Sequence, residues 1–389
     1  MTGIPYHFLW RCAIPRGALR VACGGAFVAA AGLTLAGEPR PGGLAWAAVN
    51  EQIGAAAAAA PLQMKFQGHT AEELGTWQNA FAAKLRELIG PTEPPAQWSV
   101  REISTENFPD HVREELVLSA NDAPALPLYV LRPRGAETAK YPVVLCLHGH
   151  GVGGHDSVVG RTDDPEVAKE IQRFNYDYGR QLVGKGYLVV APCFAGFGRR
   201  LEKKLRAPHV HGFPDACAMT FLRLQLFGRT AIGENLRDVR WALDYATGRR
   251  DARADRVGCV GISYGGRLTM VAAAIDTRIK AAVISCNQSM YQQTVAHHVV
   301  CGSETIPGLL AFGDTPEIAS LIAPRPMLWD GAAGHVGSNV ALWAASGRPR
   351  LERAYSAAGA SAALSFHTFP GTEAWNGAAS VEFLGRSLE

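Results

Sequence analysis

The chain has 389 residues, of which 48% are hydrophobic and 19% are charged, so it can bury a substantial core and is not an intrinsically disordered protein. Four of its 38 basic residues and one of its 35 acidic residues lie within residues 1–47, which leaves 34 of each in the remainder. This balance provides no basic field, so no nucleic-acid partner is expected.

The N-terminal segment has the layout of an export signal. Three arginines precede an apolar run from Val21 to Gly37, which ends at Glu38-Pro39-Arg40-Pro41. We therefore predict an exported protein, periplasmic or secreted, with cleavage after Ala36 or Ala47. The alternatives are an N-terminal extension or an uncleaved membrane anchor, and no later segment has the roughly 18 apolar residues that a membrane span needs.

Beyond the leader, the sequence predicts a helical preface and then alternating strands and helices. Apolar residues at helical spacing predict a helix over 70–88. The elements expected after it are strands over 115–118, 126–131, 141–147, 187–192, 256–261, 281–285, 326–329 and 363–369, and helices over 174–185, 232–247, 266–274 and 348–358. This alternation is typical of an α/β fold with a doubly wound, mostly parallel sheet.

Three regions follow from this order of elements. Residues 1–47 form the leader, 48–97 a linker and helical preface, and 98–389 the main domain. Cys146 and Cys259 lie inside apolar strands, which predicts buried free thiols, and the cysteine spacing does not match a zinc site. No metal or cofactor is expected.

Two glycine-rich turns contain the candidate catalytic groups. Gly261-Ile262-Ser263-Tyr264-Gly265 matches the pattern G-x-S-x-G between a predicted strand and a predicted helix, a context in which Ser263 becomes a candidate nucleophile. The turn His148-Gly149-His150-Gly151 follows an earlier strand. Acyl transfer needs two backbone N–H groups facing the developing negative charge, and the candidates are the N–H of Tyr264 and one near His150 or Gly151.

Together with three further motifs, these turns resemble the α/β-hydrolase superfamily, in its dienelactone hydrolase-like and acetyl xylan esterase-like branch. The further motifs are Gly228-Arg229-Thr230 leading into Asp238, Cys301-Gly302-Ser303 to Pro307-Gly308-Leu309, and Ile322-Ala323-Pro324-Arg325-Pro326. The resemblance implies about eight strands and serine-dependent hydrolysis of a small or carbohydrate-linked carboxylic ester. A small-molecule ester is therefore the expected partner.

At two positions the chain departs from the family's pattern. Where the family has the acid of its catalytic triad the chain has Gly334, and where the family has the histidine it has Glu373, in the stretch Gly371-Thr372-Glu373-Ala374-Trp375-Asn376-Gly377. A serine hydroxyl without a neighbouring base does not attack an ester at neutral pH.

Several hypotheses explain how the chain could function without the family's acid and histidine. His335 and Glu373 are candidates for base and acid with their loops exchanged, since a triad depends on roles and distances and not on chain order. Asp330 could instead orient His335, with Glu373 lining the pocket. His367 lies within the last predicted strand and is expected to be a structural histidine. The remaining hypothesis is a binding protein of the same fold that has lost its esterase activity.

Overall fold

The computed structural model describes residues 49–388 except 137, 202–215, 297–300 and 335–339. The predicted leader and its two cleavage sites therefore lie outside the described residues. Among those that are described, no helix is both long and apolar enough to cross a lipid bilayer.

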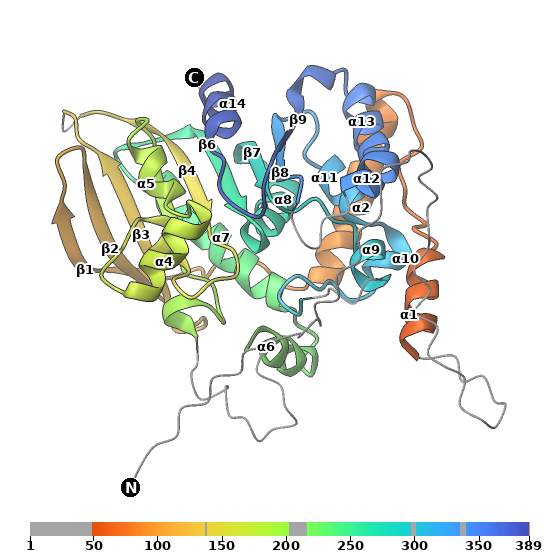
Figure 1. Cartoon of the computed structure of the whole chain (residues 1–389), viewed down its shortest axis with the longest axis horizontal. Coiled ribbons are helices and arrows are strands. Elements are labelled where there is room, and N and C mark those ends of the chain that lie inside the picture. Colours follow the sequence, from red (N-terminus) through yellow and green to blue (C-terminus); the bar gives the residue numbers. More distant parts are fainter. Residues whose placement is uncertain (1–48, 137, 202–215, 297–300, 335–339, 389) are drawn as a thin grey trace, which may run out of the picture. The chain divides into compact units, whose positions relative to one another are not determined.

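A nine-stranded sheet runs through the centre of the molecule in the order β1-β2-β3-β5-β4-β6-β7-β8-β9 (Figure 1). Strands β1, β2, β3 and β5 pair antiparallel, whereas β5, β4, β6, β7, β8 and β9 pair parallel. The strands are β1 (Ser99–Asn107), β2 (His111–Ser119), β3 (Leu126–Pro133), β4 (Tyr141–Leu147), β5 (Leu188–Pro192), β6 (Ala252–Ile262), β7 (Ile279–Ser285), β8 (Met327–Ala332) and β9 (Leu364–Phe369).

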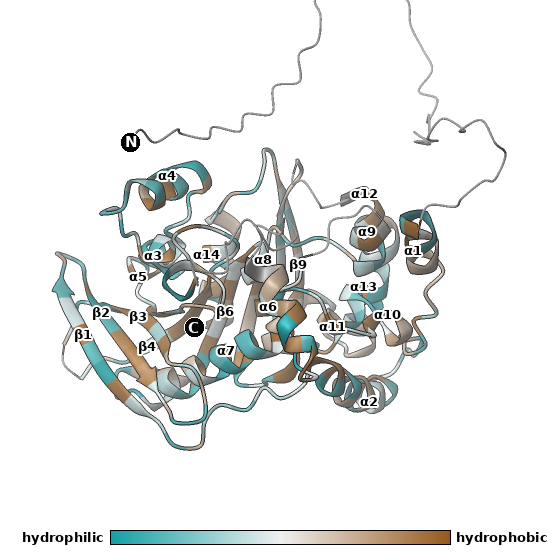
Figure 2. Ribbon diagram, turned by 90° about the horizontal axis from the view of Figure 1, so that it is seen from below, coloured by the Kyte–Doolittle hydropathy of each residue, from teal (hydrophilic) through white to brown (hydrophobic). Residues whose placement is uncertain are grey.

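The predicted fold class is confirmed, with one strand more than the sequence predicted. Strand β1 is exposed over most of its length and is coloured largely as hydrophilic in Figure 2. It lies at the edge of the sheet, where it pairs with β2. Its sequence has no apolar run because neither of its faces is deeply buried, so hydrophobic periodicity could not reveal it.

Helices cover both faces of the sheet. They are α1 (Val49–Ala58), α2 (Ala71–Ile89), α3 (His155–Val158), α4 (Pro165–Phe174), α5 (Tyr178–Val183), α6 (Ala216–Gln225), α7 (Ala231–Gly248), α8 (Tyr264–Ile275), α9 (Tyr291–Ala296), α10 (Leu309–Phe312), α11 (Thr315–Ser320), α12 (Val340–Leu342), α13 (Arg348–Ala357) and α14 (Ala378–Leu388). Short 3-10 turns occur at Gly198–Arg200 and Ser361–Ala363, and a π-helical turn at Trp343–Gly347.

Two hydrophobic cores, one on each face, follow from the alternation of side chains along the strands. In β4, Val143 and Leu145 point into the core that is covered by α7 and α8, whereas Val144 and Cys146 point into the core covered by α5 and α14. Because both faces are covered, the parallel strands are continuously apolar, which made them predictable. Cys146 and Cys259 are buried free thiols, as predicted.

The helical preface packs onto the main domain and shares its core. Helix α2 matches the predicted helix over 70–88 and begins with a capping box, in which Thr70 Oγ1 accepts from the N–H of Glu73 (3.2 Å) and the Glu73 carboxylate accepts from the N–H of Thr70 (3.0 Å). Phe81 and Leu85 of this helix are fully buried in the core that α7 and α8 cover. The preface therefore contributes to the stability of the domain.

The prediction of one helix over 174–185 was wrong. Helix α4 ends at Phe174 and α5 begins at Tyr178, because Asn175 adopts a left-handed conformation with φ +51°. The Asn175 side chain donates from Nδ2 to the carbonyl oxygen of Trp375 (2.8 Å), a residue 200 positions away. Only the folded chain supplies this acceptor, so local periodicity could not reveal the break.

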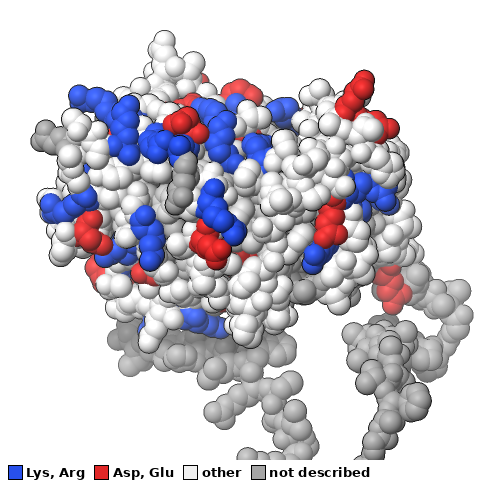
Figure 3. Space-filling model, turned by 90° about the horizontal axis from the view of Figure 1, so that it is seen from above, with Lys and Arg blue, Asp and Glu red and all other residues white. Residues whose placement is uncertain are grey.

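Charged side chains of both signs are interspersed on the face of the molecule that Figure 3 draws. Many lie in ion pairs, such as Arg249 with Glu114 (2.7 Å) and Arg278 with Asp276 (2.7 Å). This distribution agrees with the even count of basic and acidic residues after residue 47.

Candidate active site

Ser263 occupies the tight turn between β6 and α8 that the sequence predicted. Strand β6 ends at Ile262, α8 begins at Tyr264, and Ser263 between them has φ +57° and ψ −122°. A non-glycine residue with a positive φ is strained and persists only where its surroundings hold it in place. Here the N–H of Ser263 donates to the carbonyl oxygen of Ser285 (2.9 Å), and Nδ2 of Asn287 donates to the carbonyl oxygen of Ser263 (3.1 Å).

The glycines around Ser263 are required because backbone passes very close to them. A Cβ atom on Gly265 would lie 1.8 Å from the carbonyl oxygen of Leu147, and one on Gly261 would lie 2.2 Å from the carbonyl oxygen of Gly265. Likewise, a Cβ on Gly149 would lie 3.1 Å from the Cβ of Ser263. The loop after β4 therefore lies directly against the serine turn, as the G-x-S-x-G interpretation requires.

His148 is a structural member of that loop. It is fully buried, its Nδ1 lies 2.9 Å from the carbonyl oxygen of Gly149, and its Nε2 accepts from the N–H of Phe194 (3.0 Å). Burial lowers the pKa of His148 to about 4, so the imidazole is neutral at physiological pH. Because both ring nitrogens are engaged, His148 fixes the path of the backbone and is not available as a base for Ser263.

A buried carboxylate that sequence reasoning missed holds the rest of the loop. Glu170 of α4 accepts hydrogen bonds from the N–H groups of Val152 and Gly153, both at 3.1 Å, and from the hydroxyl of Ser157. A Cβ atom on Gly151 would lie 2.0 Å from an oxygen of this carboxylate. Glu170 thus fixes the segment that follows His150. Its neighbours in sequence, Lys169 and Ile171, gave no sign of this contact.

His150 faces the segment that follows β7. Its Nε2 lies 3.0 Å from Sγ of Cys301 and 3.4 Å from Oγ of Ser303, and its ring centroid is 5.3 Å from that of Tyr264. Desolvation opposes a charge on the ring, but the contact with Cys301 and the nearby carboxylates of Glu304 and Glu373 outweigh it and raise the pKa of His150 to about 9. The loop after β4 thus carries an imidazole whose protonated form is favoured at physiological pH.

The segment after β7 is anchored to α8 by a fully buried arginine that the sequence did not single out. Arg267, one helical turn after Ser263, donates to Thr315 Oγ1 (2.7 Å) and Ser289 Oγ (3.1 Å), and its Nε lies 3.4 Å from the carboxylate of Glu304. Its guanidinium also lies 4.5 Å from the ring centroid of Tyr291. Arg267 therefore connects the serine turn to the segment that carries Cys301.

The C-terminal candidate residues fall into two groups. Asp330 is fully buried in β8, where its carboxylate oxygens lie 2.8 Å from Nδ1 of His367 and 3.0 Å from Oγ of Ser380. The Asp330 carboxylate therefore already has His367 as a partner, and the structural role of His367 stays a prediction. Glu373 lies in the loop after β9, close enough to His150 for its charge to raise that pKa. His335 lies outside the described residues.

Gly334, which the sequence resemblance predicts to occupy the position of the family's acid, packs against the same C-terminal loop. Its N–H donates to the carbonyl oxygen of Gly371 (2.9 Å), and a Cβ atom at Gly334 would lie 2.7 Å from that oxygen. A side chain at this position would push the loop that carries Glu373 away. The close contact with Gly371 therefore leaves no space for an acidic side chain at position 334.

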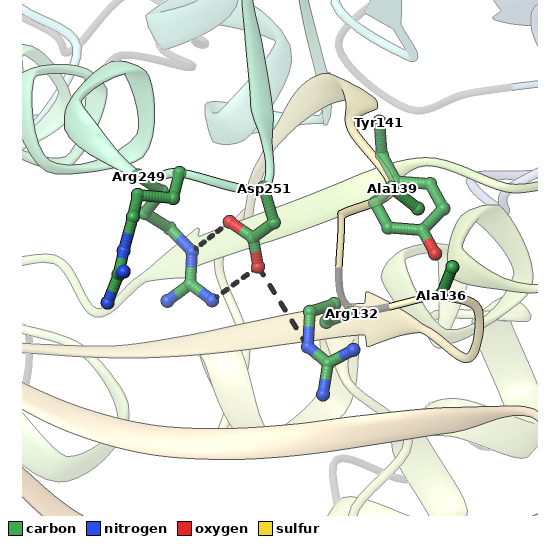
Figure 4. Close-up of a pocket in the computed structure, with 7 residues that line it drawn as sticks. Arg132, Ala136, Ala139, Tyr141, Arg249 and Asp251 are labelled. Atoms are coloured by element: carbon green, nitrogen blue, oxygen red, sulfur yellow. Dashed lines mark hydrogen bonds and ion pairs between the residues drawn. The ribbon is translucent and has the colours of Figure 1, made fainter.

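A separate cavity of about 490 Å³ lies at the amino-terminal ends of the central strands, where β4 begins at Tyr141 and β6 begins just after Asp251 (Figure 4). Ser263 follows the far end of β6, so this cavity does not belong to the site. The Arg249 guanidinium at its wall is already bound by the carboxylates of Asp251 and Glu114. Within the described residues, no group of three or more potential ligands could hold a metal ion.

Comparison with known proteins identifies the family. No protein-family model matches the chain. It is 31% identical over 283 residues, which are 70% of this chain and 85% of the relative, to YtaP of Bacillus subtilis (strain 168), a protein named provisionally as a hydrolase.

Solved structures share the fold. One, from Bacteroides fragilis NCTC 9343, is named provisionally as an acetyl xylan esterase (TM-score 0.66, 18% identity, 83% of each chain), and another is the glucuronoyl esterase from Solibacter usitatus (TM-score 0.58, 16% identity, 82% of this chain and 93% of that one). The chain therefore belongs to the same family as the hydrolase YtaP, and it shares its fold with the acetyl xylan and glucuronoyl esterases.

Proposed function

We propose that the protein hydrolyses a small or carbohydrate-linked carboxylic ester with Ser263 as the nucleophile. The observation that carries the proposal is the strained backbone of Ser263, which turns between β6 and α8 against the loop of Gly149. The crevice at the carboxyl ends of β4 and β6, where the strand order reverses, is the usual ligand site of such a sheet. The acetyl xylan and glucuronoyl esterases of the same fold favour a carbohydrate-linked ester.

The proposed reaction has two steps. Ser263 Oγ attacks the carbonyl carbon of the ester while a base takes the hydroxyl proton, and the alcohol leaves with that proton. The negative charge on the carbonyl oxygen is stabilised by the N–H of Tyr264, at the positive end of α8, and by an N–H near His150 or Gly151. Water then hydrolyses the acyl-serine and returns the proton to Ser263.

For the base we propose His335, with Glu373 as the acid that orients it. His148 and His367 have their own partners, and the Asp330 carboxylate already accepts from His367 and Ser380. Glu373, in contrast, lies close to the crevice, as its effect on His150 indicates. The exchanged pair is therefore better supported than Asp330 acting on His335.

A binding protein without turnover is the competing proposal, and the close packing at Gly334 favours it. A family-type acid does not fit there unless the loop of Gly371 moves. In that case the crevice would still bind an ester or a sugar, but Ser263 would lack a working proton-transfer pair.

Steady-state hydrolysis of p-nitrophenyl acetate distinguishes the esterase from the binding protein. We expect the wild-type protein to exceed the buffer rate and His335→Ala to lower kcat/KM by at least ~100-fold, the lower range for loss of a general base. His69→Ala, which changes a histidine outside the site, is the matched control and should keep the wild-type rate. Turnover by wild type that survives in His335→Ala would exclude this base, and no turnover by wild type would favour the binding protein.

A further inference from the structure

Cys301 differs from the other described cysteines in its surroundings. Cys146, Cys193, Cys259 and Cys286 are buried, and burial raises the pKa of each of their thiols. Cys301 is partly exposed, and its sulfur lies 3.0 Å from His150 Nε2 and 2.9 Å from Ser303 Oγ. A thiol, an imidazole and a hydroxyl thus meet next to Tyr264, the residue that follows Ser263.

Charges around the pair favour a protonated imidazole. Burial opposes a charge on His150, but its hydrogen bond and charge interaction with the Cys301 sulfur, followed by the carboxylates of Glu304 and Glu373, raise its pKa to about 9. The protonated ring is therefore favoured at physiological pH. Arg267 holds Glu304 in this place at 3.4 Å.

Two further titratable groups among the described residues act on the pair. His148 lies within electrostatic reach of His150 but is neutral, and Tyr291, within reach of Cys301, has its pKa raised chiefly by burial. Neither group therefore adds a charge at physiological pH. The groups of the described residues therefore favour a protonated ring, and an imidazolium beside a thiol stabilises the thiolate, which is the reactive form of cysteine.

We propose that Cys301 and His150 form a nucleophilic thiol–imidazole pair that makes Cys301 a covalent modification site for α,β-unsaturated carbonyl compounds. In the reaction, His150 holds the proton of the thiol while the sulfur forms a bond to the β carbon of the electrophile. The electron pair of the carbon–carbon double bond moves to the α carbon, which then takes a proton, so no oxidant or leaving group is needed. The adduct occupies the crevice beside Ser263.

The test follows alkylation with N-ethylmaleimide, read out peptide by peptide by mass spectrometry at pH 6.5 and pH 8.5. An ordinary thiol of pKa about 8.5 is ~1% thiolate at the lower pH and ~50% at the higher, so its rate changes by about 50-fold. We expect Cys301 to react before Cys146, Cys193, Cys259 and Cys286, and its rate to change by less than about 5-fold. Cys146 and Cys259 serve as internal controls and should react only after unfolding.

Two variants locate the cause. His150→Gln keeps a hydrogen-bonding side chain without the charge, and Cys301 in that variant should return to a roughly 50-fold pH dependence. Ser263→Ala should leave the labelling of Cys301 unchanged, so the result does not depend on the proposed esterase function. The proposal is overturned if Cys301 reacts no faster than the buried cysteines, if its wild-type rate follows an ordinary thiol, or if His150→Gln leaves its pH profile unaltered. If His150→Gln does not fold, the pH profile of the wild-type protein alone decides whether the proposal stands.

Discussion

The Ser263→Ala variant is expected to lower kcat/KM for ester hydrolysis by at least ~1000-fold. Removing the nucleophile of a serine hydrolase eliminates the acyl-enzyme route and leaves only what binding and the oxyanion hole supply. The fold should be kept, because the bonds that hold the turn involve the backbone N–H and carbonyl of Ser263, which alanine retains. Circular dichroism and the thermal midpoint should therefore match those of wild type.

Ser361→Ala is the matched control for this variant. Ser361 is exposed in the short 3-10 turn before β9, outside the crevice, and its replacement should keep the wild-type rate. A Ser263→Ala protein that is well folded and still hydrolyses the ester within about 10-fold of wild type would contradict the assignment of the nucleophile.

The largest expected effect on stability is that of Gly265→Ala. A methyl group there would lie 1.8 Å from the carbonyl oxygen of Leu147, which belongs to the backbone of a central strand and cannot rotate away. Either β4 or α8 must shift, and we expect the free energy of unfolding to fall by about 3 kcal/mol, the upper part of the range for overpacking. Urea denaturation followed by tryptophan fluorescence measures this change.

Gly75→Ala provides the contrast. Gly75 lies inside α2 with no atom within 4 Å of an added Cβ, so the same substitution should raise the free energy of unfolding by about 0.5–1 kcal/mol through helix propensity. Equal effects of the two substitutions would show that the backbone of β4 can move away from Gly265 at little cost in free energy.

The sequence predicted those parts of the fold that depend on local patterns. The apolar run 141–147 coincides with β4, and the G-x-S-x-G turn falls between β6 and α8 with the strained serine that this pattern predicts. Both depend on residues that are adjacent in the chain. Burial on two faces and a turn that only small residues can flank leave a clear local signal.

Other parts depend on contacts between distant residues and had no local signal. Glu170 holds the loop after β4 from a helix 17 residues further on, and Arg267 anchors a segment whose bonded oxygen in Thr315 lies 48 residues away. In sequence, each looks like an ordinary charged residue on a helix. The contact between Cys301 and His150 had no local signal either, because the two residues are 151 positions apart.

The base and acid could not be settled from the sequence because it has Gly334 and Glu373 where the resemblance implies an acid and a histidine. Gly334 and Glu373 lie in neighbouring loops whose packing is visible only in the folded chain, where the carbonyl oxygen of Gly371 closes the space at Gly334. Sequence spacing can name His335 and Glu373 as substitutes, but it does not give their distance from Ser263.

The central claim, that Ser263 is an activated nucleophile, is tested most directly by labelling the native protein with a fluorophosphonate probe. Such a probe reacts only with a serine whose hydroxyl is activated by a base, and it requires no knowledge of the substrate. We expect stoichiometric labelling of the peptide that contains Ser263, its loss in Ser263→Ala and its retention in Ser361→Ala. A native protein that remains unlabelled, or that is labelled on another serine, would contradict the claim.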